Sequence, residues 1–143
     1  MNAAPAPLRL RARDVEDLAV ISALVQDALV AVHDIAYLPE AQRFVLAVNR
    51  FRWEAEAGSA AEGERVHAGL RFEGVGQARF RGIDRGRPGR VLSLLAIAHD
   101  AGSAILHFAE GAAIQLEVAA LDCVLEDMDE PWPALRRPQH APD

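Results

Sequence analysis

The sequence predicts an α+β domain with about seven strands in a mainly antiparallel sheet or partly open barrel, and a helix near each end. Short runs of alternating apolar and polar residues recur between residues 29 and 118, and turn-forming residues separate them. One segment near each end instead has apolar residues at helical spacing. The pattern contains no strand–helix–strand alternation, which argues against a parallel α/β fold.

The first forty residues predict a strand, a helix and a second strand. Leucine alternates with arginine over Leu8–Ala12, which favours a short strand. Asp14 is typical of a helix N-cap, and the apolar spacing after it predicts a helix over Val15–Gln26. Leu29–Leu38 is rich in Val, Ile and Tyr and predicts one strand that ends before Pro39.

A hairpin is predicted next, because residues 39–42 begin with a proline that pre-sets a turn. The return strand is predicted over Arg43–Glu54. Its apolar residues share one face as far as Val48 and continue on the other face from Phe51. A change of face within a strand indicates a bulge or bend near Asn49.

The remaining strands follow at short intervals, separated by small polar loops at 55–63 and 84–90. The strand over Val91–Ala98 is apolar on both faces, so we expect it to be central and covered. The predicted strands are Val66–Phe72, Gln77–Ile83, Val91–Ala98, Ala104–Ala109 and Ala112–Val118.

A C-terminal helix is predicted over Ala119–Asp129, because apolar residues fall at i, i+3, i+4 and i+7. Seven antiparallel strands capped by such a helix also describe the pleckstrin-homology-like barrel, a match of element order alone. We expect a single domain over residues 8–133 with flexible termini at 1–7 and 134–143. The four apolar residues of the predicted helix are Leu121, Val124, Leu125 and Met128.

Composition excludes several classes of protein. The 143 residues are 51% hydrophobic and 25% charged, as in a folded globular chain, and the net charge of −6 disfavours general nucleic-acid or anionic-membrane binding. Cys123 is the one cysteine, so no intramolecular disulfide and no cysteine-rich zinc site can form. The chain has no lysine and no glycine-rich phosphate loop. We therefore expect no cofactor and no metal.

The predicted location is the cytoplasm. The N-terminus has no apolar stretch of signal-peptide length. The longest apolar runs are far shorter than the roughly 20 residues that span a bilayer.

Four segments resemble an uncharacterised bacterial family, domain-of-unknown-function family 2948. They are EDLAVISALVQDAL (16–29), YLPEAQRFVLAVNRFRWE (37–54), RGIDRGRPGRVLSLLAI (81–97) and IQLEVAALDCVLEDM (114–128). The resemblance covers residues 8–138 and implies a single domain. It implies no activity, ligand or catalytic residue.

An arginine cluster is the first candidate site. Its members lie on one predicted strand and on the glycine- and proline-containing loop after it, which could wrap an anion with guanidinium groups and backbone N–H groups. The alternative is a solvated loop in which the arginines pair with acids such as Asp84. The cluster consists of Arg79, Arg81, Arg85, Arg87 and Arg90.

Charge is unevenly distributed along the chain. Residues 43–90 carry ten arginines against six acids, whereas residues 91–130 carry eight acids and no lysine or arginine. This asymmetry indicates an internal complement between sheet and helix, head-to-tail self-association, or a solvated helix face.

Histidine and cysteine chemistry is not expected. His33-Asp34 and His99-Asp100 place imidazole beside carboxylate, but adjacent residues on a strand point to opposite faces. A tight turn would also put His99 and His107 on opposite faces. Cys123 is predicted among carboxylates on the polar helix face, which would raise its pKa.

These observations do not identify a function. They favour a small, non-catalytic cytoplasmic interaction domain that binds a protein partner or a second copy of itself, and no membrane. The alternative is a small-anion-binding protein or an enzyme that uses the arginine-rich segment 79–90.

Overall fold

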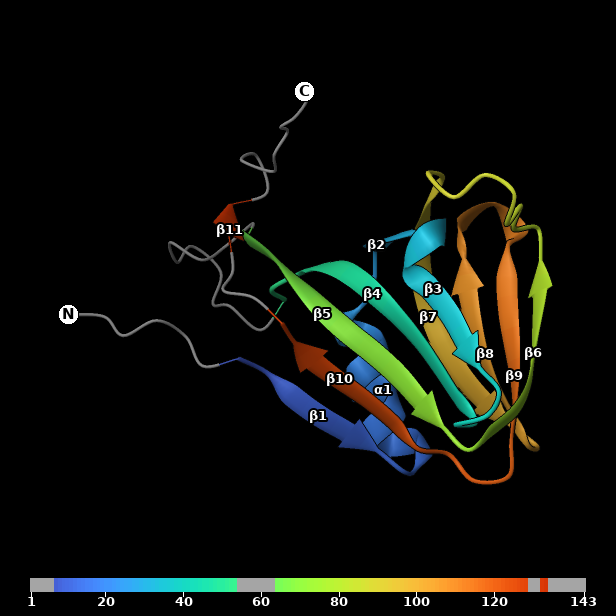
Figure 1. The fold of residues 1–143 in the computed structure, drawn as a ribbon. Helices are drawn as coiled ribbons and strands as arrows, with labels where there is room; N and C mark the ends of the chain where they lie inside the picture. Colours follow the sequence, from blue (N-terminus) through green and yellow to red (C-terminus); the bar gives the residue numbers. More distant parts are fainter. Residues whose placement is uncertain (1–6, 54–63, 129–131, 134–143) are drawn as a thin grey trace.

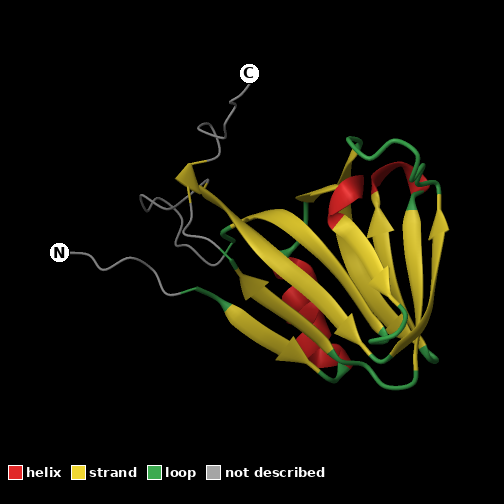
Figure 2. Cartoon of the chain, in the orientation of Figure 1, coloured by secondary structure: helices red, strands yellow, loops and turns green. Residues whose placement is uncertain are grey.

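The computed structural model describes residues 7–53, 64–128 and 132–133, and within them eleven antiparallel strands form one sheet (Figures 1 and 2). These residues also contain one α-helix and two short 3₁₀ turns. The elements are β1 (Arg9–Ala12), α1 (Val15–Leu24), β2 (Ala28–Ala31), η1 (Val32–Asp34), β3 (Ile35–Leu38), β4 (Arg43–Phe51), β5 (Glu64–Glu73), β6 (Val75–Arg81), β7 (Val91–Asp100), β8 (Ser103–Phe108), η2 (Ala109–Gly111), β9 (Ala113–Val118), β10 (Cys123–Asp127) and β11 (Trp132–Pro133).

The sheet runs in the order β1-β10-β5-β4-β2-β7-β8-β9-β6, with β3 beside β4 and β11 beside β5. It has two halves, which lie to the left and right in Figure 1. Strand β2 joins them, because it pairs with β4 only at Leu29–Asn49 but with β7 along its whole length. β1 and β6 are therefore the end strands of an open sheet.

The core combines side chains from both halves. The chain passes from one half to the other twice, through Gly74 between β5 and β6 and through residues 119–122 between β9 and β10 (Figure 1). Fully buried side chains come from β4 and β5, from β7, β8 and β9, and from α1; they include Phe44, Leu46, Leu70, Phe72, Leu94, Leu106, Ile114, Leu116 and Ile21.

The N-terminal helix is confirmed, although it ends at Leu24 rather than Gln26. The Asp14 carboxylate accepts a hydrogen bond from the backbone N–H of Asp17 at 2.8 Å, as an N-cap does. The Ser22 hydroxyl accepts a hydrogen bond from the backbone N–H of Ile97 at 2.9 Å. The helix thus packs against β7 and satisfies a backbone donor of that strand.

The predicted C-terminal helix is wrong: this segment forms strand β10, between β1 and β5. A short run of apolar residues is compatible with the spacing of a helix and with the spacing of a strand, and pairing with β1 and β5 makes this segment a strand. The pleckstrin-homology comparison depended on that helix. The strand count also exceeds the predicted seven, since the eleven strands include the short strands β2, β3 and β11.

Two other strand predictions need correction. Leu29–Leu38 is not one strand, because η1 interrupts it where the backbone N–H of Val32 donates to the carbonyl oxygen of Arg90 at 2.9 Å. β7 is not covered on both faces: Val91 and Leu95 are 56% and 43% exposed. Residue type alone does not show where a strand changes its partner or which face a second layer covers.

Of the bulge or bend predicted near Asn49, the bulge is wrong, since β4 pairs with β5 without a register shift from Arg43 to Phe51. The inward position after Val48 is filled by Arg50, which is fully buried. Its guanidinium forms two hydrogen bonds with the Asp127 carboxylate, at 3.1 and 3.0 Å. A charged residue can occupy the inner face here because a buried acid neutralises it.

The other predicted strands and the turn at 39–42 are confirmed, with ends shifted by a few residues. The predicted loop at 55–63 and residues 1–6 and 134–143 of the predicted flexible termini lie outside the described residues.

Candidate functional site

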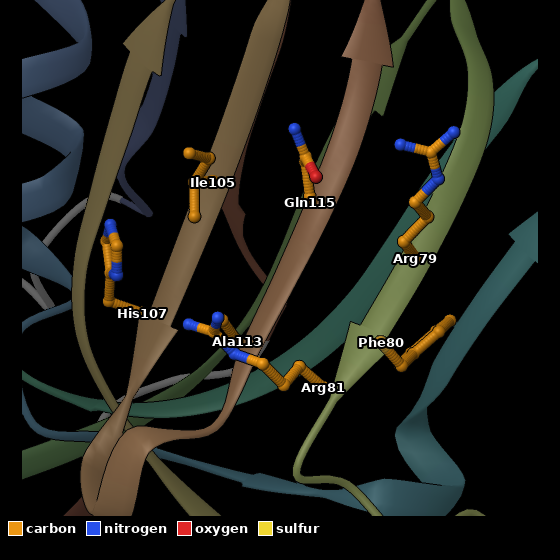
Figure 3. Close-up of a pocket in the computed structure, with 7 residues that line it drawn as sticks. All are labelled: Arg79, Phe80, Arg81, Ile105, His107, Ala113 and Gln115. Atoms are coloured by element: carbon orange, nitrogen blue, oxygen red, sulfur yellow. The ribbon is translucent and has the colours of Figure 1, made fainter.

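The outer face of β6, β9 and β8 carries a cluster of polar side chains (Figure 3). Strand register sets two rows across it. Arg79 lies opposite Gln115, which lies opposite Ile105; Arg81 lies opposite Ala113, which lies opposite His107. These residues, together with Phe80, line a hollow of about 260 Å³.

The two arginines of this face differ in their partners. Arg79 donates to the side-chain oxygen of Gln77 at 3.1 Å and lies 3.3 Å from the Glu117 carboxylate. Arg81 is exposed, and its side chain has no hydrogen bond or ion pair with any residue of the described part of the chain. The Arg81 guanidinium is therefore the cation on this face that remains available to an incoming anion.

The predicted five-arginine cluster does not come together. The Arg85 guanidinium lies 4.2 Å from the ring centre of Phe80, and that ring packs against Phe44 rather than facing outward. Arg90 donates to the carbonyl oxygen of Gly82 at 3.2 Å and lies 3.9 Å from Glu110.

Arg87 is exposed, and its side chain has no partner among the described residues. The expected acid Asp84 accepts from the backbone N–H of Gly86 at 2.9 Å and so closes the loop itself. Arg79 and Arg81 alone share the hollow, because residues two apart on a strand share a face whereas the loop turns elsewhere.

Sequence reasoning missed Gln115 and His107 as neighbours of the arginines. Alternation with the apolar residues of their own strands is enough to place both side chains on the outer face, so the outward orientation is predictable from the sequence. The strand order β8-β9-β6 could not, because nothing in the local pattern specifies which strands pair.

The oppositely charged parts of the sequence form ion pairs with each other within the chain, which is one of the three arrangements expected. Five of the acids after residue 91 pair with arginines from earlier in the chain, and none of these pairs joins the sheet to a helix at the C-terminus. The pairs are Arg11–Asp122, Arg50–Asp127, Arg71–Glu126, Arg79–Glu117 and Arg90–Glu110.

Histidines provide no metal site: no group of three or more metal-ligating side chains occurs within residues 7–53, 64–128 and 132–133. His33 and Asp34 do approach to 3.6 Å, contrary to expectation, because they lie in the turn η1 rather than on a strand. His99 lies opposite Ala104 and His107 opposite Ala96, which confirms that these histidines face opposite sides.

Cys123 does not lie on a polar helix face. It lies on β10 and is fully buried in the core. Burial and the nearby Asp122 carboxylate raise the pKa of the Cys123 thiol, which keeps it protonated and weakly nucleophilic.

The fold defines a class: an α+β domain with one curved antiparallel sheet and, in the described residues, one helix. The chain belongs to a family described as "Protein of unknown function (DUF2948)", whose model matches residues 8–140. No curated protein and no solved structure matches the chain. No helix of the described residues is long and apolar enough to cross a membrane.

Proposed function

We propose that this domain is a non-catalytic interaction module that binds an extended, acidic segment of a protein partner along the open edge of β6. The observation that carries the proposal is the position of Arg81. Its side chain is a cation without a partner among the described residues, on the outer face of the last strand in the sheet.

The backbone of β6 supports strand addition. Its first residue, Val75, is bonded to the β3–β4 hairpin: its N–H donates to Gln42 and its carbonyl accepts from the Tyr37 hydroxyl, both at 2.8 Å. From Gln77 to Arg81, β6 pairs on one side with β9, and the sheet order places no strand on its other side. Alternate residues of this stretch direct N–H and C=O groups outward, where an added strand can pair with them.

The side chains favour an acidic partner. Directly opposed side chains on neighbouring antiparallel strands have Cβ atoms about 4.5–5.5 Å apart, so a carboxylate on an added strand would reach Arg81. Arg79, on the same face, already forms an ion pair with Glu117, so it attracts a second acid less strongly. An alternation of acidic and apolar residues would place its carboxylates beside both arginines.

A second copy of the chain fits this edge less well. Two copies joined antiparallel through β6 would bring the arginines of both outer faces together, and opposed like charges are destabilising. A drug-sized molecule also fits less well, because the hollow of about 260 Å³ is smaller than the roughly 300–1,000 Å³ typical of ligand pockets.

The test is a titration of the full chain with a labelled heptapeptide that alternates Glu and Val. We expect measurable binding, and Arg81→Glu should weaken it by about tenfold or more, since a charge-assisted hydrogen bond contributes about 1.5–3 kcal/mol. Arg87→Glu is the matched control: it makes the same charge change on the neighbouring loop and should alter affinity much less.

Three outcomes would contradict the proposal. Equal loss in the Arg81 and Arg87 variants would show general attraction to positive charge. Equal binding of a heptapeptide with Lys in place of Glu would exclude recognition of acids. Competition by inorganic phosphate with the same dependence on Arg81 would favour the alternative, a small-anion-binding protein.

A further inference from the structure

A separate hollow is lined by residues of β2, β4 and β5, the turn η1 and the start of β7. Figure 1 shows these strands away from the β6 edge. Its volume of about 160 Å³ is close to the 150 Å³ of an apolar cavity that holds benzene. Its walls are mostly apolar, and its polar side chains are Asn49, His67 and Asp34. The apolar side chains are Leu29, Ala31, Ala47, Val48 and Val91.

Asn49 has a donor without an acceptor. The residue is 5% exposed, and its side-chain nitrogen Nδ2 is buried with no hydrogen-bond partner among the described residues. A buried donor left in this state costs about as much free energy as a lost hydrogen bond. The hollow is therefore lined by a side chain whose donor has no acceptor among the described residues.

The orientation of the Asn49 amide is fixed by its neighbour Arg65. The Arg65 Nη1 donates both to the backbone oxygen of Asn49, at 2.9 Å, and to its side-chain Oδ1, at 3.0 Å. Because a guanidinium can only donate, the amide oxygen must face Arg65 and the NH₂ group must face the other way. The guanidinium is held in turn by the ring of Phe51, 3.8 Å from its centre.

We propose that this hollow binds a small, uncharged, apolar molecule whose carbonyl oxygen accepts a hydrogen bond from Asn49 Nδ2. The apolar walls cannot solvate a charge, and the Asp34 carboxylate in the lining repels an anion. A carbonyl oxygen is a pure acceptor, whereas a hydroxyl would bring a further donor that needs its own partner. The site is independent of the β6 edge, since no residue lines both hollows.

The chain suits a direct test, because it contains two asparagines, Asn2 and Asn49. Protein labelled with ¹⁵N in the asparagine side chains gives two pairs of NH₂ signals in a nuclear magnetic resonance spectrum, one pair for each asparagine, and Asn49→Ser assigns them. Titration with cyclopentanone should move the Asn49 NH₂ signals downfield in a saturable way. Cyclopentane, the same ring without an acceptor, should not produce this shift.

Two substitutions locate the site without removing the reporter. Ala47→Leu fills the hollow and should weaken cyclopentanone binding by about tenfold. Ala36→Leu makes the same change at an exposed position on β3, outside the lining, and should leave binding unchanged.

The proposal is wrong if cyclopentanone leaves the Asn49 signals unmoved or if Ala47→Leu titrates like the unmodified chain. It is also wrong if the Asn49 amide stays in contact with a long-lived water at saturating ketone, since the acceptor would then be water. None of these results depends on peptide binding at β6, so the two proposals can fail separately.

Discussion

β1 and β6 are the two end strands of the sheet, and each carries two arginines on either side of one apolar residue. In β1, Arg9 lies 3.6 Å from Glu126, and Arg11 donates twice to Asp122 at 2.8 Å. In β6, Arg79 has Glu117, whereas Arg81 has no partner in the described residues.

The same local pattern, two arginines on either side of one apolar residue, has a different role at each end of the sheet. The acids near the neighbouring strand determine whether the arginines are neutralised. Glu126 of β10 and Asp122, the residue before β10, offer acids to the two arginines of β1, so that end is neutralised as part of the fold. β9 offers one acid to β6 and then, opposite Arg81, Ala113. The end with the unpaired cation is the one that we propose binds a partner.

The largest expected effect comes from removing the strand that neutralises β1. A chain that ends at Val118 loses β10, which leaves β1 and β5 without their shared neighbour. Cooperative unfolding should disappear in calorimetry, whereas a chain that ends at Pro133 should unfold like the full protein. A cooperative transition in the shorter chain would refute this account of the fold.

Next in size is the buried pair that holds β10 to β4. Asp127→Asn removes the carboxylate charge of the buried Arg50–Asp127 pair, and breaking such a pair costs about 3–5 kcal/mol. Asp127 also accepts from the backbone N–H of Leu8 at 3.0 Å, so the start of β1 should loosen as well. Chemical denaturation measures the loss. Glu126→Gln, at the exposed neighbouring position, should cost less than about 1 kcal/mol.

A smaller effect should appear at the other end. Glu117→Gln removes the acidic partner of Arg79, so that β6 carries a stronger positive charge. Affinity for the Glu/Val heptapeptide should rise, by up to about fivefold if the surface pair is worth up to about 1 kcal/mol. Glu110→Gln, near Arg90, is the control. A fall in affinity after Glu117→Gln would count against the electrostatic argument.

The smallest effect concerns Arg11 and pH. The hydrogen-bonded Arg11 guanidinium lowers the pKa of Asp122 below its ordinary value of 3.8. A carboxyl with a lowered folded-state pKa stabilises the protein above its ordinary pKa, and this contribution disappears as pH falls through the folded value. Arg11→Gln should therefore destabilise the chain slightly at pH 7 and converge with the unmodified protein under strongly acidic conditions. A gap that persists in acid would show that the pair does not act through this titration.

Much of the fold could be predicted from the sequence because most elements have an unambiguous period. The Asp14 cap, helix α1, the hairpin at 39–42 and strands β4 to β9 were all predictable, with small shifts at their ends. The segment around Val124 was not, since its few apolar residues fit a helix or a strand. Only pairing with β1 and β5, a long-range property, makes it a strand.

The candidate site was predictable in part for the same reason. Alternation along β6 places Arg79 and Arg81 on one face, and that local property was correct. Whether an arginine is neutralised depends on the residues opposite it, as the contrast between Asp122 and Ala113 shows. The unpaired Nδ2 of Asn49 likewise depends on Arg65, sixteen residues further along the chain.

The most direct test of the central claim is amide hydrogen exchange with and without the Glu/Val heptapeptide. We expect slower exchange at alternate amides between Gln77 and Arg81, and no change at Arg9–Ala12, because among the described residues β6 has an arginine side chain without an acidic partner and β1 does not. Protection at β1, or peptide binding without protection on β6, would contradict it.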